Sequence, residues 1–457
     1  MDLSRALALA ADGRDSALAD LIELVRIPSV STDPAYAGDV ARAADWLTER
    51  LRALGLDVTV EPGDPHPVVC AEWMGRPCAP VLGLYSHYDV QPPDPLELWD
   101  SAPFEPVVRD GALVGRGVRD DKGQLVAGLK AVEYALAAGG PPVNLRLFYE
   151  GEEEIAGSSL AEVLRAGVQR WHCDCVFVVD GQFAEPGLPT VLTALRGVLL
   201  FSIEVKGPAT DLHSGLFGGV APNPINALTR ILAALTDDEG RVLVPGYYDG
   251  IVPPSEAERA GWERLTLTDE SLRAEIGAAA LVGEPGHSAI ERLWARPTFD
   301  VHGIRGGYVG EGIKAVIPAT ASAIAGMRLV PGQDPARILE ALRAYVARVA
   351  PPGVRVTVRS RGQANPMSFS TRGPGAAAML DALRETFGAE PLLGRMGGSI
   401  PVTADFAATV ADDLVVVGFG LPNDGNHAPN ERFRLEQFHG ATEALLRGFA
   451  GYRRRTA

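Results

Sequence analysis

The chain has 457 residues, a length that predicts two domains and leaves room for a third. Apolar residues make up 46% of it and charged residues 22%, a composition typical of globular proteins that argues against disorder and against a fibrous fold. The formal net charge of −16 would repel phosphate groups, so we expect no nucleic-acid partner and no anionic membrane, whereas cations would be attracted.

The start of the chain does not resemble a targeting segment. Its short Ala/Leu run lacks a basic beginning, and Asp12 and Asp15 interrupt the apolar part. No uncharged run reaches the roughly 18 residues that a membrane helix needs. The four cysteines also fit a reducing compartment, so the sequence predicts a cytoplasmic protein.

Helices are predicted first, at 15–29 and 39–55, where apolar residues recur at helical spacing. Strands and helices then alternate along the chain. The predicted segments are apolar strands at 79–86, 145–149 and 173–180 and helices at 122–140 and 156–167. Such alternation is typical of an α/β domain whose mainly parallel sheet is covered by helices on both faces.

The pattern changes near residue 194. Three later segments, at 196–207, 317–332 and 353–362, favour strands without regular alternation, which indicates a separate α+β domain. After about residue 370 the first pattern returns, with a buried strand and a closing helix. We therefore predict an α/β fold with a split catalytic domain and an inserted α+β domain. The catalytic domain would consist of residues 1–194 and 371–457, and the inserted domain of residues 195–370.

Each predicted apolar strand of the catalytic domain is followed by a histidine or a carboxylate, and one more carboxylate comes just before the helix at 122–140. In open parallel sheets, ligands bind just beyond the carboxyl ends of the strands. The five positions are His87, Asp120, Glu154, Asp180 and His427. Because these positions would meet at one edge of the sheet, we expect them to form one site.

Two histidines and three carboxylates would suit Zn²⁺, with Mn²⁺ or Co²⁺ as alternatives. One metal takes three or four protein ligands, so five ligands with one bridging carboxylate suit two metals about 3.5–4 Å apart. Each residue alone also has an ordinary explanation, as a core histidine, a helix N-cap or part of a solvated acidic run. Those explanations are poor together, because all five positions fall on the same side of the sheet.

Seven segments, which span nearly the whole chain in order, resemble the metallopeptidase family M20. The resemblance is greatest to its dipeptidase branch, the cytosolic nonspecific dipeptidases and carnosinases. The segments are HYDVQP (87–92), GRGVRDDKG (115–123), EGEEEIAGS (150–158), VVDG (178–181), DLHSGLFGG (211–219), GGSIPVTADF (397–406) and GNHAPNE (425–431). No single segment is specific, but the set is.

The resemblance implies roles for the residues of these segments. The five positions above match the family's metal ligands, with Asp120 as the bridging carboxylate. Asp89 matches the acid that holds the imidazole of His87. Glu153 matches the general base. The bond between Asp120 and Asp121 is often cis in the family.

Three further roles follow from the same resemblance. His213 matches a histidine that reaches into the partner's active site and stabilises the oxyanion, which implies a homodimer formed through the inserted domain. Arg328 and Ser399 match residues that hold the terminal carboxylate of the substrate. The insert would then act both as a lid and as the dimerisation domain.

The chain departs from carnosine-cleaving members at two positions. Residue 363 is Gln where those members have His, and residue 315 is Ala where some have Thr. Neither position is among the predicted metal ligands. The departures therefore argue against a preference for His-containing dipeptides and leave the predicted metal site intact.

The predicted reaction is hydrolysis of the peptide bond in dipeptides or short peptides, by a metal-bridging hydroxide with Glu153 as general base. An N-acyl-amino-acid amidohydrolase of the deacylase or desuccinylase type, on the same scaffold, stays open as an alternative. A non-catalytic metal-binding scaffold protein is a further alternative, but it would need no base beside the ligands. A serine hydrolase is disfavoured, since the sequence has no G-x-S-x-G segment.

Overall fold

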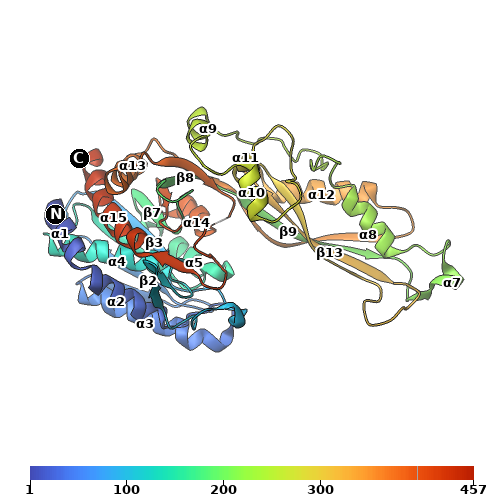
Figure 1. Ribbon diagram of the computed structural model, residues 1–457, viewed down its shortest axis with the longest axis horizontal. Coiled ribbons are helices and arrows are strands. Elements are labelled where there is room, and N and C mark those ends of the chain that lie inside the picture. The colour runs from blue at the N-terminus through green and yellow to red at the C-terminus, as the bar shows by residue number, and fades with distance from the viewer. Residues whose placement is uncertain (399) are drawn as a thin grey trace.

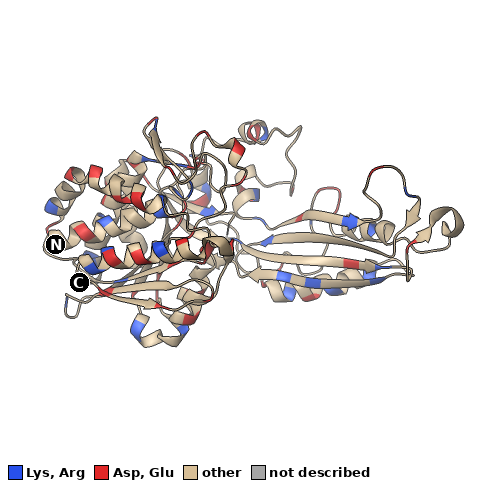
Figure 2. Cartoon of the chain, turned by 90° about the horizontal axis from the view of Figure 1, so that it is seen from below, with Lys and Arg blue, Asp and Glu red and all other residues tan. Residues whose placement is uncertain are grey.

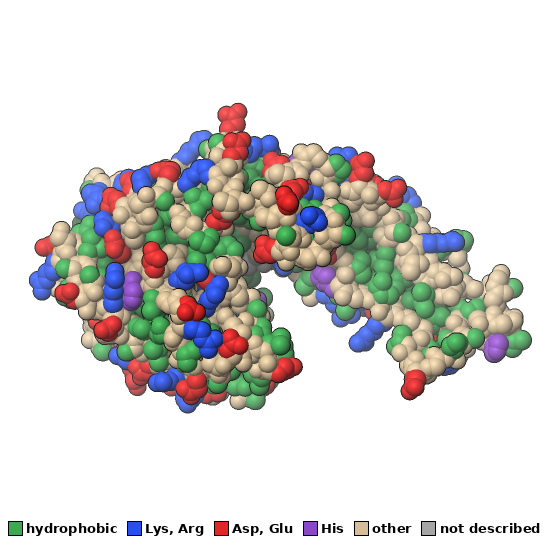
Figure 3. Space-filling view, in the orientation of Figure 1, with side chains coloured by type: hydrophobic (Ala, Val, Ile, Leu, Met, Phe, Trp, Pro, Cys, Tyr) green, Lys and Arg blue, Asp and Glu red, His purple; other side chains and the backbone are tan. Residues whose placement is uncertain are grey.

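The computed structural model describes residues 1–398 and 400–457 and shows an elongated molecule with two lobes (Figure 1). The larger lobe contains both termini and a nine-stranded sheet, and the smaller lobe contains a four-stranded sheet. A wide hollow separates the lobes on the face shown in Figure 3. Acidic and basic residues alternate along the helices of the larger lobe (Figure 2).

The nine-stranded sheet is parallel at its centre and antiparallel at its edges. Its order is β1-β2-β6-β3-β7-β17-β8-β15, and β16 also pairs with β8. β6, β3, β7 and β17 run parallel to one another, which confirms the predicted α/β architecture. The strands are β1 (Asp57–Glu61), β2 (Val68–Trp73), β3 (Val81–His87), β6 (Asn144–Glu150), β7 (Cys175–Val179), β8 (Thr190–Leu195), β15 (Met367–Ser368), β16 (Leu392–Met396) and β17 (Leu414–Val417).

Helices cover both faces of this sheet because its central strands are apolar on both sides. In β3, Leu82 and Leu84 join one core, while Val81 and Tyr85 pack into the other. The first face is covered by α1 (Leu3–Asp12), α2 (Arg14–Val25), α3 (Ala37–Ala53), α4 (Lys122–Ala137), α13 (Pro374–Phe387) and α15 (Leu435–Thr456). The second is covered by α5 (Ser159–Ala166), α6 (Val168–Trp171) and α14 (Val402–Thr409).

The sheet of the smaller lobe is antiparallel and has one covered face. Its order is β11 (Thr298–Gly306), β13 (Thr320–Leu329), β9 (Gly197–Lys206) and β14 (Arg355–Ala364). Alternate residues of β9, beginning at Leu199, pack against α8 (Pro224–Ala233) and α12 (Pro335–Val349). At the far end of this lobe lie β10 (Leu212–His213), α7 (Ser214–Phe217) and β12 (Val316–Ile317) (Figure 1).

A helical segment of the predicted insert packs against the nine-stranded sheet. It consists of α9 (Glu256–Trp262), α10 (Asp269–Glu275) and α11 (Ala289–Trp294). Glu258 forms an ion pair of 2.7 Å with Arg395 of β16, and Trp262 Nε1 donates to the carbonyl of Leu393 at 2.8 Å. This segment belongs by sequence to the predicted insert, yet it packs against a sheet of the larger lobe. The domain boundaries near residues 194 and 370 therefore stay predictions.

Short elements complete the larger lobe. They are η1 (Pro34–Tyr36), η2 (Leu96–Leu98), η3 (Glu153–Ile155), β4 (Val107–Arg109), β5 (Ala112–Val114) and β18 (Arg432–Arg434), of which the three strands form a small separate sheet. β1 and β2 were not predicted from the sequence. Among the described residues, no helix combines the length and the apolar character that crossing a bilayer requires.

Candidate active site

The predicted metal ligands all lie near the carboxyl ends of the central strands. His87 is the last residue of β3, Asp180 follows β7, and Asp120 comes two residues before α4. β3 runs parallel to β6 and β7, so these strands end at the same edge of the sheet. Glu154 lies in η3, just after β6, and His427 lies in the loop after β17.

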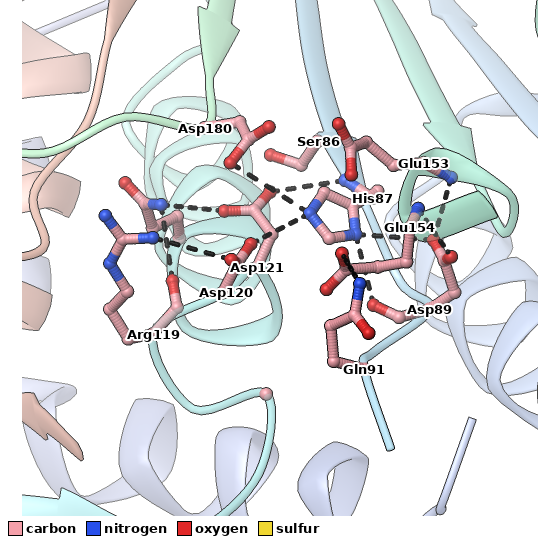
Figure 4. A network of polar contacts seen from close by, with 12 residues as sticks. Ser86, His87, Asp89, Gln91, Arg119, Asp120, Asp121, Glu153, Glu154 and Asp180 are labelled. Carbon is pink, nitrogen blue, oxygen red and sulfur yellow. Dashed lines mark hydrogen bonds and ion pairs between the residues drawn. The ribbon is translucent and has the colours of Figure 1, made fainter. Parts of the chain in front are cut away.

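Asp120 lies between two clusters of possible metal ligands. One cluster is His87, Asp120 and Asp180, the other is Asp120, Glu154 and His427, and the ligand atoms within each lie within 4.8 Å of one another. Oδ1 of Asp120 is 3.1 Å from Nε2 of His87 (Figure 4), whereas its Oδ2 is 3.1 Å from Nε2 of His427. A carboxylate whose two oxygens face two clusters is suited to bridge two cations.

The electrostatics of these carboxylates fit cations as well. Burial raises the pKa of Asp180 to about 7 and that of Glu154 to about 8. Burial acts in the same direction on Asp120, but hydrogen bonds with His427 and His87 hold its pKa well below the usual range. Oε1 of Glu154 is buried and has no hydrogen-bond partner among the described residues. Because buried charges in proteins are paired or coordinate metals, this donor set fits divalent cations.

The sequence profile of peptidase family M20/M25/M40 matches residues 83–449. The chain belongs to this family. It is therefore a metallopeptidase, and the resemblance to M20 dipeptidases seen in the sequence is confirmed.

Individual M20 relatives match almost the whole chain. A Cys-Gly metallodipeptidase of Schizosaccharomyces pombe is 29% identical over 450 residues, which cover 93% of each protein. A cysteinylglycine-S-conjugate dipeptidase of Corynebacterium striatum is 31% identical over 427 residues, which cover 92% of this chain and 91% of that protein. The crystal structure of human carnosine dipeptidase 1 superposes with a TM-score of 0.83 at 27% identity and covers 99% of both chains.

Asp89 contacts both the ring of His87 and the backbone of Glu153 and Glu154. Its Oδ1 is 3.3 Å from Nδ1 of His87, and its backbone carbonyl is 3.1 Å from the same nitrogen. The carboxylate also accepts hydrogen bonds from the backbone nitrogens of Glu153 and Glu154, at 3.2 and 3.1 Å, and from Ser31 Oγ at 2.6 Å. Because Nδ1 is engaged by Asp89, Nε2 is left to face the ligand cluster.

Glu431 was not predicted as a site residue, yet it holds the loop that carries Asp120. Its buried carboxylate accepts hydrogen bonds from the backbone nitrogens of Gly117, Arg119 and Asp120, at 2.9, 2.9 and 3.1 Å. Arg116 forms a further ion pair of 2.6 Å with it. The one signal in the sequence was a carboxylate at the end of the GNHAPNE segment, which is compatible with many roles.

Two other polar side chains touch the ligands without having been predicted to do so. Gln91 Nε2 donates to Oε2 of Glu154 at 2.8 Å. The carboxylate of Asp121 accepts the backbone N–H of His87 at 3.2 Å. The Asp120–Asp121 peptide bond is cis, as the resemblance to the family implied.

Glu150 and Glu152, for which we predicted no role, are buried structural residues. The hydroxyl of Tyr85 donates to Glu150 at 2.6 Å. The carboxylate of Glu152 accepts hydrogen bonds from Ser159 Oγ at 2.7 Å and from the backbone of His66 at 2.8 Å. The acidic run at 150–154 is therefore not a solvated surface, and its members have different partners.

His213 and Arg328 belong to neither of the two clusters of ligand candidates. His213 is exposed beside α7, at the opposite end of the molecule from the larger lobe (Figure 1). Arg328 is half-buried in β13, where it pairs with Val198 of β9. Ser399 lies outside the described residues. Within one chain, the structure brings together the metal-ligand candidates, Asp89 and Glu153, but not His213.

Proposed function

We propose that the protein hydrolyses the peptide bond of dipeptides or short peptides with two divalent cations. The observation that carries this proposal is the position of Asp120 between two ligand clusters, with Glu153 adjacent in sequence to one of the ligands. Similarity over 92–93% of the chain to proteins named dipeptidases supports the choice of substrate.

In this proposal His87, Asp120 and Asp180 hold one cation, and Asp120, Glu154 and His427 hold the other. Nitrogen and carboxylate ligands suit Zn²⁺ best, and Mn²⁺ and Co²⁺ accept the same set. When bound, two such cations lower the pKa of water toward neutrality and polarise a carbonyl oxygen. The residues of the chain supply the proton transfer and the orientation.

We assign the proton transfer to Glu153. Figure 4 shows its side chain alongside His87 and Ser86, and Asp89 fixes its backbone nitrogen. Burial raises the pKa of its carboxyl group well above the usual range. Glu153 would take a proton from the attacking water and give it to the leaving amine, which requires one carboxylate within reach of both.

We further propose that the active protein is a homodimer, in which His213 acts in the partner's active site. Near His213 the smaller lobe exposes several large apolar side chains, among which Val309 is 92% and Ile313 100% exposed. Exposed apolar groups of this kind mark interaction surfaces. His213 could then stabilise the oxyanion, and Arg328 with Ser399 could bind the substrate's carboxylate when the hollow between the lobes closes.

A mixing experiment tests the role of His213. We expect His213→Ala and Glu153→Gln to be nearly inactive as homodimers. When equal amounts are exchanged into mixed dimers, each mixed dimer has one intact site, formed by Glu153 of one chain and His213 of the other. Random exchange then restores about a quarter of wild-type kcat, since a C2 dimer has two equivalent sites. No recovery in mixed dimers shown to form by native mass spectrometry would contradict action across the dimer.

The substrate class is tested with Cys-Gly, carnosine and N-acyl amino acids, each assayed after chelation and after addition of Zn²⁺, Mn²⁺ or Co²⁺. We expect chelation to abolish hydrolysis and metal to restore it. Cys-Gly should be cleaved faster than carnosine, because Gln363 and Ala315 depart from carnosine-cleaving members. Cleavage of N-acyl amino acids alone would favour the amidohydrolase alternative, and activity that chelators leave untouched would refute the metal assignment.

A further inference from the structure

Arg119 is a buried cation beside the proposed bridging carboxylate. Its side chain is 4% exposed, and its Nη1 is 3.5 Å from Oδ2 of Asp120. Its Nη2 donates to Oε1 of Gln182 at 2.7 Å, and its Nε has no hydrogen-bond partner among the described residues. Figure 4 shows the guanidinium on the Asp120 side of His87, away from Glu153.

The fold reserves space for this guanidinium. Gln182 and Gly420 form a parallel bridge just beyond β7 and β17, and Arg119 lies against both of them. A Cβ atom at Gly420 would lie 2.3 Å from Nε of Arg119, so a side chain there would displace it. The fold therefore holds the Arg119 side chain in a defined position. Hydrolysis as proposed above makes no use of it.

Arg119 contacts one of the two carboxylate oxygens of Asp120. It approaches Oδ2 of Asp120, which is the oxygen that faces His427, whereas Oδ1 faces His87. A fixed positive charge at this range repels a cation bound to the same oxygen. It also offsets the repulsion among the carboxylates when no cation is bound. Both effects favour release of the ion that Asp120 would share with Glu154 and His427.

We propose that Arg119 is a positioning residue that lowers the affinity of the Asp120–Glu154–His427 cluster for its divalent ion and keeps that cluster assembled after the ion leaves. The proposal rests on the two-cation site proposed above. It assigns to this chain one ion that is held tightly and one that exchanges readily. The exposure of the His427 side chain, which is 50%, gives the exchanging ion a route to solvent.

The test is calorimetric titration of the metal-free protein with Zn²⁺, in wild type and in Arg119→Met. We expect the weaker of two dissociation constants to tighten by about tenfold or more, since a unit charge at this range exceeds the ~1.4 kcal/mol that a tenfold change represents. The stronger constant should change less. The melting temperature of the metal-free form should fall, so that the rise on adding Zn²⁺ becomes larger than in wild type.

Three further variants separate charge from structure. Arg119→Lys keeps the charge and should bind Zn²⁺ like wild type. Gln182→Glu neutralises the guanidinium in place and should tighten the weaker site even if Arg119→Met fails to fold. Arg146→Met is the control, because it removes a partly buried cation, paired with Glu72 at 3.0 Å, near the opposite end of β6. This control should leave both dissociation constants unchanged.

The outcomes distinguish this inference from the proposed function. A wild-type protein that binds no divalent ion overturns both. Two ions in wild type, with unchanged or weaker affinity in Arg119→Met and in Gln182→Glu, overturn the role of Arg119 alone. Equal falls in the melting temperatures of the metal-free and metal-loaded forms would show a merely structural role and would also overturn it.

Discussion

Replacing Glu153 by Gln is expected to lower kcat by about 10²- to 10⁴-fold, the contribution typical of a general base. Gln has nearly the same shape as Glu but cannot accept a proton at neutral pH. Because Glu153 belongs to neither ligand cluster, the variant should still bind two cations. The measurement is kcat on the best dipeptide of the substrate panel, together with metal content by elemental analysis. Turnover within tenfold of wild type would refute the assignment of Glu153.

Glu152→Gln is the matched control, since it is the same substitution one residue away. The carboxylate of Glu152 contacts Ser159 and the backbone of His66, which lie outside the ligand clusters. We expect a loss of stability of about 1–3 kcal/mol, from weakened hydrogen bonds to a buried charge, and a kcat close to wild type. If Glu152→Gln lost as much kcat as Glu153→Gln, both losses would be due to a disturbed loop structure. The loss in Glu153→Gln would then be no evidence for proton transfer.

Replacing Asp120 by Ala is expected to weaken the binding of both cations by at least about a hundredfold, because each cluster falls from three ligands to two. Activity should be lost at any metal concentration that sustains the wild type. The measurement is the number of cations retained after gel filtration, with dissociation constants from chelator competition. The effect on two ions at once is what a bridging position predicts.

His427→Ala provides the comparison, since His427 belongs to one cluster only. We expect this variant to retain about one cation after the same gel filtration and to be inactive as well. Retention of one cation by Asp120→Ala, with full binding strength at the other cluster, would show that Asp120 does not bridge. Loss of both cations from His427→Ala would show that the two sites are not separable.

Much of the fold and of the ligand set could be predicted because it depends on local patterns. Strands such as β3 and β7 are buried on both faces, so they are apolar throughout and stand out from the residues that follow them. His87 and Asp180 come directly after such strands. Parallel strands end at one edge, which is enough to place these side chains together without any coordinates.

The residues that were missed depend on contacts between distant parts of the chain. Glu431 holds Gly117 from 314 positions away, and no spacing or periodicity connects the two segments. The contacts of Gln91 and Arg119 could not be predicted for the same reason, because a polar residue in a loop has many possible partners. The sequence also suggested a solvated acidic run as one explanation for 150–154, whereas Glu150 and Glu152 are buried. Only packing decides which member of a like-charged run turns inward.

By itself, the sequence determined the α/β class, the membership of family M20 and the identity of the metal-ligand candidates, because strand burial and motif order are properties of neighbouring residues. The tertiary structure alone decided which oxygen of Asp120 faces which histidine, that Glu431 anchors the loop and that Arg119 lies against the same carboxylate. It also decided that His213 lies at the end of the molecule farthest from the metal-ligand candidates of the same chain. These contacts join segments that are far apart in the sequence and meet only when the chain folds, so no local pattern encodes them.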